Sequence, residues 1–274
     1  MTARDVEILS DVGALHEAAA ERFVRIVTSS IQHNGRCSVA LAGGATPNGL
    51  YALLASKPFR SRVPWHAVHV FWGDERCVPP DDPRSNYRAA YELLLAHVPV
   101  LPANIHRIEG EREPSEAAAR YETSLRAHFE TPIGAPRFAP EARFDLVLLG
   151  LGTDGHTASL FPGGNALHER ERWVTADYAP SQGAWRVTLT PPLLNAAARV
   201  QFMVAGSDKR EILTEVLAHG HRANAKAASG DVGYPAQAIV PLEGELCWLV
   251  DAAAAGAAAA DERPPDVRGV SAPG

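Results

Sequence analysis

The sequence is poor in cysteine, has no long apolar run and contains no cluster of lysine and arginine. Its three cysteines, Cys37, Cys77 and Cys247, are widely separated and form no C-x-x-C pair, which argues against a disulfide framework and against a cysteine-based zinc or redox site. No stretch reaches the roughly 18 apolar residues of a membrane span, and the charged N-terminus lacks the apolar core of a signal peptide. We therefore expect reduced thiols in a cytoplasmic protein that does not enter a membrane.

The balance of charge argues against partners with extended negative charge. Lys and Arg number 26 against 32 Asp and Glu, which gives a net charge of −6 and no basic surface for nucleic acid or an anionic membrane. An anionic small molecule must therefore be held by a few local cations. Because 46% of the residues are hydrophobic, the chain can bury a sizeable core. We expect one domain over residues 1–260 and a flexible tail over 261–274, where proline, glycine and charge predominate.

Several catalytic and metal-binding motifs are also missing. The sequence has no G-x-S-x-G nucleophile elbow and no H-E-x-x-H zinc motif. His219 and His221 lie two apart, but no acidic or cysteine partner is near them in sequence, so we expect no metal site. The segment from Gly44 to Gly49 begins like a P-loop, but Leu50 follows where lysine is required. A serine hydrolase and a nucleotide triphosphatase are therefore disfavoured.

Helix-like and strand-like segments alternate along the chain. Amphipathic runs predict helices, and short apolar runs predict strands. The helices are expected at residues 14–35, 47–56, 85–98, 114–130, 191–198 and 208–220, and the strands at 37–43, 68–72, 144–150, 186–190, 200–206 and 246–250. Because several of the strands are apolar throughout, the pattern predicts an α/β fold whose mostly parallel sheet is covered by helices on both faces.

Four loops with unusual chemistry, residues 43–49, 73–76, 150–156 and 207–210, each follow a predicted strand. In open parallel sheets, ligands bind beyond the carboxyl ends of the strands, so we expect these loops to meet in one crevice. In the first loop, Gly43 and Gly44 allow a ligand to approach the backbone closely, and Thr46 adds a hydroxyl. Pro47 fits the first turn of the following helix, and the loop is therefore predicted to hold an anion. The alternative is a tight turn that simply requires glycine.

The second and fourth loops carry the candidate cations. Asp74, Glu75 and Arg76 are consecutive, and Arg76 can bind a phosphate or carboxylate through paired donors. A salt bridge between Arg76 and one of its acidic neighbours is the alternative. Ser85, farther along, is a candidate helix N-cap. Lys209 lies near a helix start, where a cation opposes the helix dipole unless an anion is bound; an exposed, solvated lysine is the alternative.

The third loop has the G-x-G-x-x-G pattern of a dinucleotide fingerprint, but the rest of that motif is missing. A fingerprint needs a long helix after the third glycine, and here Pro162 and two more glycines follow soon after Gly155. What remains is a glycine-rich turn that presents Asp154 beside His156. A histidine with an ordinary pKa of about 6.5 can accept a proton from water at neutral pH, and a carboxylate can orient its ring. We expect His156 to be catalytic, the alternative being a structural, hydrogen-bonded histidine.

Four motifs taken together resemble the 6-phosphogluconolactonase family. They are LAGGATP (41–47), FWGDERCVPPDDPRSNY (71–87), GLGTDGHTASLFPG (150–163) and RVTLTPPLLNAAARVQFMVAGSDKREIL (186–213), and the resemblance extends in the family's order from residue 5 to residue 251. It implies hydrolysis of 6-phospho-D-glucono-1,5-lactone to 6-phospho-D-gluconate in the oxidative pentose phosphate pathway. It also implies the three-layer α/β/α sandwich shared with glucosamine-6-phosphate deaminase and ribose-5-phosphate isomerase, with no metal and no organic cofactor.

The resemblance also implies roles for individual residues. His156 is the expected general base that deprotonates water, and Asp154 is expected to orient it. The residues expected to bind the substrate are Gly43, Gly44, Thr46, Asp74, Arg76, Arg186 and Lys209. Among them, the two glycines are expected to donate backbone N–H groups to the tetrahedral oxyanion, whereas the threonine and the basic side chains are expected to hold the phosphate.

Two departures from the family pattern and two other functions bear on this interpretation. The first loop has alanine at the two positions flanking its paired glycines where the family commonly has serine, and Thr153 stands where proline commonly precedes the aspartate.

A glucosamine-6-phosphate deaminase shares the fold, but it commonly has tyrosine where Arg76 stands and Asn-Glu-Pro after the histidine. A noncatalytic sugar-phosphate sensor has no need of Asp154 or His156. The sequence leaves the oligomeric state open, with a monomer favoured.

Overall fold

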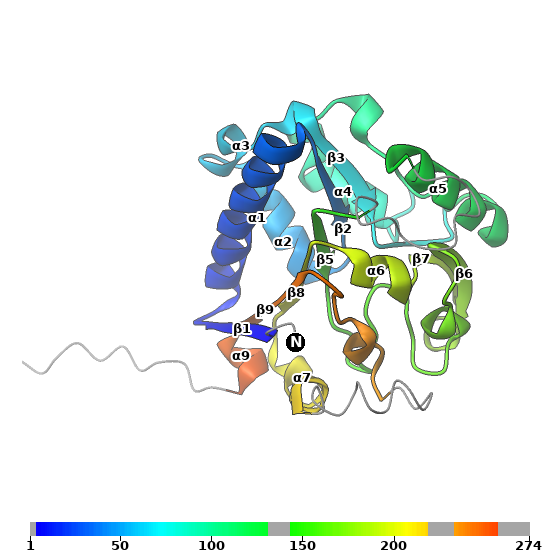
Figure 1. Ribbon diagram of the computed structural model, residues 1–274. Helices are drawn as coiled ribbons and strands as arrows, with labels where there is room; N and C mark the ends of the chain where they lie inside the picture. Colours follow the sequence, from blue (N-terminus) through cyan, green and yellow to red (C-terminus); the bar gives the residue numbers. More distant parts are fainter. Residues whose placement is uncertain (1–3, 131–142, 219–232, 257–274) are drawn as a thin grey trace, which may run out of the picture.

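The central feature of the computed structural model is a six-stranded sheet in which every neighbouring pair is parallel (Figure 1). The structure describes residues 4–130, 143–218 and 233–256. The strand order is β1-β9-β8-β5-β2-β3. Their bounds are β1 Arg4–Leu9, β2 Cys37–Leu41, β3 Val68–Trp72, β5 Leu146–Leu149, β8 Arg199–Val204 and β9 Glu245–Asp251. The predicted α/β class with a mostly parallel sheet is confirmed.

Helices lie on both faces of this sheet and complete a three-layer arrangement, with α1 and α3 to the left in Figure 1 and α5 and α6 to the right. The helices are α1 Val12–Asn34, α2 Ala45–Ala55, α3 Phe59–Arg62, α4 Asn86–Leu93, α5 Pro114–His128, α6 Pro191–Ala196, α7 Arg210–Ala218 and α9 Ala252–Ala255. The short 3-10 turns are η1 Trp65–Ala67, η2 Leu95–His97, η3 Pro102–Asn104, η4 Asn165–His168, η5 Pro180–Gln182, η6 Ser207–Lys209 and η7 Pro235–Ala238. No described helix is long and apolar enough to cross a membrane.

Helix boundaries follow local chemistry that the sequence already displays. α1 ends at Gly35, whose φ of 74° is left-handed and therefore favours glycine, and whose N–H donates to the carbonyl of Ile31. α4 begins after Ser85, whose hydroxyl accepts from the N–H of Arg88 as an N-cap. Both boundaries were predicted. The predicted tail over 261–274 lies outside the described residues.

A second, three-stranded antiparallel sheet was not predicted. It has the order β4-β7-β6, with β4 Asp74–Arg76, β6 Val174–Ala179 and β7 Ala184–Leu189. The expectation that residues 73–76 form a loop is therefore wrong for three of the four residues, which pair with β7. Three charged residues have neither the length nor the apolar character that signals a strand.

β1 and β6 were also missed. Strands were predicted from short apolar runs, whereas both of these alternate charged or polar residues with apolar ones on partly exposed edges.

Two buried tyrosines fix the carboxyl ends of adjacent strands in the main sheet. The hydroxyl of Tyr51 in α2 accepts from the N–H of Ala42 (3.0 Å) and donates to its carbonyl (2.6 Å), just after β2. The hydroxyl of Tyr121 in α5 accepts from the N–H of Trp72 (2.8 Å) and donates to its carbonyl (3.0 Å), at the end of β3. Each phenol thus satisfies two backbone groups where a strand turns into a loop, and the loops begin from fixed points.

Tyr121→Phe is expected to lower the free energy of unfolding by about 1–3 kcal/mol, because the buried N–H and carbonyl of Trp72 lose their partner. Urea unfolding monitored by circular dichroism measures the change. Tyr178→Phe is the control, since that ring is 44% exposed and its loss should change stability by less than about 0.5 kcal/mol. Equal stability of the two variants would show that the Tyr121 hydroxyl does not hold the end of β3.

Candidate active site

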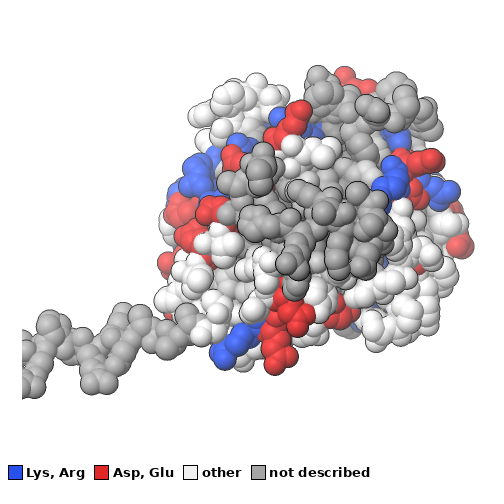
Figure 2. All heavy atoms as spheres, turned by 60° about the horizontal axis from the view of Figure 1, so that its bottom comes forward, with Lys and Arg blue, Asp and Glu red and all other residues white. Residues whose placement is uncertain are grey.

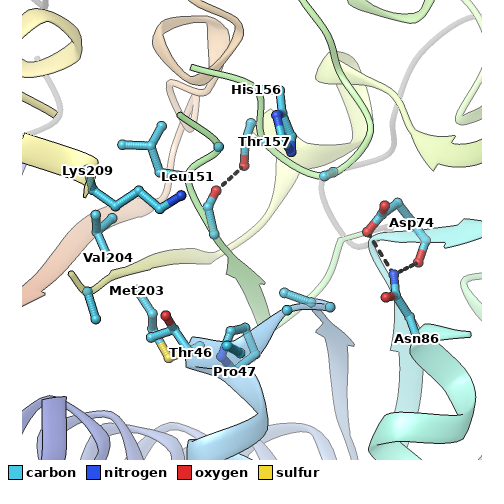
Figure 3. A pocket seen from close by; sticks show the side chains of 18 of the residues that line it. Thr46, Pro47, Asp74, Asn86, Leu151, His156, Thr157, Met203, Val204 and Lys209 are labelled. Carbon is cyan, nitrogen blue, oxygen red and sulfur yellow. Dashed lines mark hydrogen bonds between the residues drawn. The ribbon is translucent and has the colours of Figure 1, made fainter. Parts of the chain in front are cut away.

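A cavity of about 410 Å³ lies beyond the carboxyl ends of β8, β5, β2 and β3, which are four adjacent strands of the main sheet (Figure 3). All four loops singled out in the sequence contribute to its wall, so the predicted convergence is confirmed. The predicted site residues that line it are Gly43, Gly44, Thr46, Asp74, Arg76, His156 and Lys209. Asp154 and Arg186, also predicted, are not part of the lining.

The first wall of the cavity is the glycine turn between β2 and α2. Gly44 has a φ of 106°, which only glycine adopts readily. At Gly43 a Cβ would lie 2.0 Å from Oδ1 of Asn86, so this position requires the absence of a side chain. Nε2 of His16 in α1 contacts the carbonyl of Thr46 at 2.9 Å and anchors the start of α2. The turn is therefore held in place and presents its backbone to the cavity.

Asp74 is a buried carboxylate next to the glycine turn, and Asn86 contacts both. It is 8% exposed, and its Oδ2 accepts from the hydroxyl of Ser159 at 2.6 Å. The side-chain amide of Asn86 donates to the backbone carbonyl of Asp74 (2.9 Å) and to its Oδ1 (3.3 Å), as the dashed lines in Figure 3 show. Neither Ser159 nor Asn86 was singled out from the sequence. Their roles arise from contacts between segments that are far apart in the chain.

Glu75, the next residue, is the carboxylate that joins β4 to the start of α4. Its side chain accepts from the backbone N–H groups of Arg76 (2.7 Å), Asn86 (2.8 Å) and Tyr87 (2.8 Å) and from the hydroxyl of Ser85 (3.0 Å). Burial raises the pKa of Glu75, whereas the backbone N–H donors act in the opposite direction. A negative charge at a helix N-terminus is favourable. This carboxylate therefore fixes the residues on either side of it, Asp74 and Arg76.

Arg76 does not form the salt bridge that was considered as an alternative. None of its nitrogens is paired with a carboxylate of a described residue, although Asp74 and Glu75 are its neighbours in sequence. Its Nη1 donates to the carbonyl of Arg84, and its buried Nε has no hydrogen-bond partner among the described residues. Because a buried N–H of a guanidinium is costly to leave unpaired, the side chain is suited to an anionic ligand.

Arg186 lies beside Arg76 rather than in the cavity wall. The two residues are register partners in the antiparallel pair β4·β7. The guanidinium of Arg186 donates to Oε1 of Gln182 and to the carbonyl of Trp185. Burial and the neighbouring charge of Arg76 both lower the pKa of Arg186. The structure thus places a second cation next to Arg76, with its donors engaged elsewhere.

The turn after β5 presents the histidine. The N–H of Gly152 donates to the carbonyl of His156 (2.8 Å), and Gly155 has a φ of 80°, so the chain reverses within five residues. Oδ1 of Asp154 lies 2.5 Å from Nδ1 of His156 and also accepts from the His156 backbone N–H at 3.1 Å. A Cβ at Gly152 would lie 2.0 Å from Nδ1 of His156, so glycine is required there. The turn therefore fixes both the position and the orientation of the imidazole.

The electrostatics of this pair favour a base at Nε2. Although burial raises the pKa of Asp154, hydrogen bonds from the backbone and ring of His156 outweigh it and hold that pKa below its usual value. The ionised carboxylate accepts a hydrogen bond from the N–H at Nδ1, which leaves the lone pair of Nε2 free. The ring also packs against Phe161, with centroids 4.6 Å apart, and its side chain is 25% exposed. His156 therefore reaches the cavity while its ring is held on two sides.

Lys209 completes the site from the fourth loop. Its Nζ lies 3.2 Å from Oδ2 of Asp208, a lining residue that was not singled out from the sequence. The turn before it is held by Asp251 at the end of β9, whose carboxylate accepts from the N–H of Gly206. In Figure 3, Lys209 points into the cavity from the side opposite Asp74, with His156 and Thr46 on the remaining sides. The arrangement can hold an anionic ligand near a histidine base.

Comparisons with known proteins agree with this geometry. Residues 10–248 match the family described as Glucosamine-6-phosphate isomerases/6-phosphogluconolactonase. The chain is 40% identical over 252 residues to a 6-phosphogluconolactonase of Nostoc sp., covering 92% of this chain and 97% of that protein. The structure of 6-phosphogluconolactonase from Trypanosoma cruzi superposes with a TM-score of 0.77 at 28% identity, covering 93% and 97% of the two chains. A monomeric glucosamine-6-phosphate deaminase superposes with a TM-score of 0.71 at 20% identity over 92% and 99%, which shows the shared fold alone.

Glu75→Gln is expected to lower the free energy of unfolding by about 2–3 kcal/mol, because one amide oxygen cannot accept from the four donors that the carboxylate now satisfies. Urea unfolding at neutral pH measures the change. Glu92→Gln, in the same region of α4, removes an exposed pair with Arg88 and should cost less than about 0.5 kcal/mol. If Glu75→Gln is as stable as this control, the Glu75 contacts do not fix β4 to α4.

Proposed function

Because the chain belongs to the glucosamine-6-phosphate isomerase/6-phosphogluconolactonase family, we propose that it hydrolyses 6-phospho-D-glucono-1,5-lactone to 6-phospho-D-gluconate. This reaction is the second step of the oxidative pentose phosphate pathway. The observation that carries the proposal is one cavity whose wall includes both His156, oriented by Asp154, and the cations Arg76 and Lys209. Such a cavity suits a substrate with a phosphate at one end and an ester carbonyl at the other.

His156 is the general base of the proposed reaction. Its Nε2 takes a proton from water as the water oxygen attacks the lactone carbonyl carbon. Asp154 accepts from Nδ1 and stabilises the imidazolium that forms. The tetrahedral intermediate then collapses, the bond from the carbonyl carbon to the ring oxygen breaks, and that oxygen takes the proton back from His156. The proton that His156 takes from water is the one that it gives to the ring oxygen, so the reaction needs no other acid.

The oxyanion is stabilised by the glycine turn in this proposal. Gly43 and Gly44 line the cavity, and their N–H groups donate no hydrogen bond to a described residue. Backbone N–H groups that are already oriented toward a developing negative charge stabilise it without reorganisation. The contact between Gly43 and Asn86 sets how closely this turn approaches Asn86 and, through it, Asp74.

Arg76, Lys209 and Thr46 hold the phosphate in this proposal. Arg76 has an unpaired buried Nε, Lys209 points into the cavity, and Thr46 lies in the first turn of α2, where backbone N–H groups favour an anion. Arg186 contributes its charge from behind Arg76 without touching the ligand. Asp74 has acceptor capacity beyond its two protein donors and is suited to a sugar hydroxyl.

Basic and acidic side chains lie next to one another on the described part of the surface in Figure 2, with no broad basic patch. This distribution is consistent with a small-molecule partner held by a local cluster of cations. The cytoplasmic location and the monomeric state that the sequence favours belong to the same proposal. Size-exclusion chromatography with light scattering tests the monomer directly.

The experiment that tests the function compares two substrates. Freshly generated 6-phosphogluconolactone, with product formation coupled to an excess of 6-phosphogluconate dehydrogenase, is expected to be hydrolysed well above its spontaneous rate. Glucosamine 6-phosphate is expected to yield no ammonia. Ammonia release without lactone hydrolysis would identify a deaminase, and binding of either sugar phosphate without turnover would identify a sensor.

Arg76→Ala is expected to raise KM about 10- to 100-fold, because a charge-assisted contact with the phosphate is lost, while kcat changes little. Steady-state kinetics with the lactone measure both constants. Arg84→Ala is the matched control in the same segment, because its exposed side chain pairs with Asp82. The substitution keeps the backbone carbonyl of residue 84, to which Arg76 donates. An unchanged KM in Arg76→Ala would remove this residue from the phosphate site.

Gly43→Ala is expected to lower kcat/KM about 10- to 100-fold, because the new methyl group displaces the buried side chain of Asn86 and shifts the cavity wall. Gly73→Ala is the matched control, since its Cβ would meet only one backbone oxygen at an ordinary 3.5 Å. The control should keep its kcat/KM within about twofold, given that it is outside the cavity. Equal activity of both variants would show that the close approach of Gly43 to Asn86 is not needed.

A further inference from the structure

Three histidines that are far apart in the sequence lie together at the other end of β3. His69 is the second residue of β3, His106 follows η3, and His128 is the last residue of α5. An isolated parallel bridge between Val70 and Ile105 places His106 alongside β3, and the N–H of His106 donates to the carbonyl of Val70 at 2.8 Å. All three rings are partly buried. Because the catalytic cavity lies beyond the carboxyl ends of the strands, this cluster is separate from it.

The spacing of the ring nitrogens suits a metal ion. Nδ1 of His69 and Nε2 of His106 are 3.2 Å apart, and one nitrogen from each of the three rings lies within 4.8 Å of the others. Tetrahedral zinc with Zn–N distances of about 2.0–2.1 Å requires ligand nitrogens about 3.3–3.4 Å apart. One pair already has nearly this separation, and the third ring needs a shift of up to about 1.5 Å. Among the residues that the structure describes, no other group of three metal-ligating side chains lies this close.

The chemistry of the three donors narrows the choice of ion. Each neutral imidazole offers one nitrogen lone pair, so the three rings supply three nitrogen donors. The guanidinium of Arg36 adds positive charge near His69 and His128. Three neutral nitrogens with no carboxylate suit borderline ions such as zinc and do not suit magnesium or calcium, which take oxygen ligands. The charge of Arg36 lowers the affinity of the site for any cation. It does not change the preference for zinc over magnesium or calcium.

The surroundings hold the rings in place. Oγ of Ser38 in β2 lies 2.7 Å from Nε2 of His128, so one nitrogen of that ring is occupied and the other remains for a metal. Phe71 stacks on His106 with centroids 4.3 Å apart and planes 7° apart, and it packs against His128 at 4.9 Å. His106 also lines a surface cavity of about 550 Å³ beside α5.

We propose that His69, His106 and His128 bind one zinc ion, with water in the fourth position. The ion joins three segments that are far apart in the sequence: the edge strand β3, the segment after η3 and the end of α5. The ion does not take part in the proposed hydrolysis, since the site does not adjoin the catalytic cavity. This inference is independent of the proposed lactonase activity. The alternative is a cluster of neutral rings in which His69 and His106 share one hydrogen-bonded proton.

Zinc titration of the chelator-treated, full-length protein by isothermal calorimetry tests the site. The wild type is expected to bind one equivalent. His106→Phe is expected to bind at least about 100-fold more weakly, because it loses a ligand nitrogen while the aromatic contact with Phe71 is kept. Ser38→Ala is expected to bind about 10- to 100-fold more weakly through the loss of the contact that orients His128. Thermal unfolding should show a zinc-dependent rise in Tm for the wild type only.

Two control variants test whether zinc binds to histidines outside this cluster. His219→Asn/His221→Asn, outside the described residues, and His156→Asn, in the catalytic cavity, are both expected to keep the full equivalent. Loss of binding in either control, with retention in His106→Phe, would overturn the proposal, as would a wild type that binds no zinc. If His106→Phe fails to fold, His69→Asn and Ser38→Ala decide the question by the same titration. Cobalt in place of zinc should give the visible absorption of a four-coordinate site in the wild type and not in these variants.

Discussion

Parallel pairing of β8, β5, β2 and β3 is the constraint on which the rest of the site depends. Because the four strands run in the same direction, their carboxyl ends lie along one edge of the sheet, and the segments that follow them share one cavity. An antiparallel arrangement of the same segments would place alternate loops at opposite edges. The cluster of cations and the histidine would then be separated by the length of a strand.

Parallel pairing brings the loops together, but buried polar contacts fix their shapes. Tyr51 holds the end of β2, Glu75 holds β4 to α4, and Asp251 holds the turn before Lys209. In each case one side chain satisfies backbone groups that would be costly to bury unpaired. The cavity is thus formed before a ligand arrives. This preorganisation is the condition under which His156 and the glycine turn can act on a carbonyl without moving.

The sequence predicts the main sheet and the turn that brings Asp154 beside His156 well, because both have strong local signals. Apolar strands, Gly35 and Ser85 at helix boundaries, and the Asp154–His156 pair are all visible over short stretches of the chain. The second sheet was missed, because β4 consists of three charged residues whose strand geometry comes only from pairing with β7. Asn86, Ser159 and the His69 cluster were missed for the same reason, since their partners are distant in sequence.

The two ends of the sheet therefore carry different chemistry. At one end, His156, which Asp154 orients, shares a cavity with Arg76 and Lys209, and the proposed hydrolysis depends on Nε2 of His156 as the base. The most direct test compares kcat of the wild type and of His156→Ala with fresh 6-phosphogluconolactone, after subtraction of the spontaneous rate. The account predicts a fall of about 10²- to 10⁴-fold in kcat with a nearly unchanged KM in a folded variant. An unchanged kcat would contradict the assignment of His156 as the base.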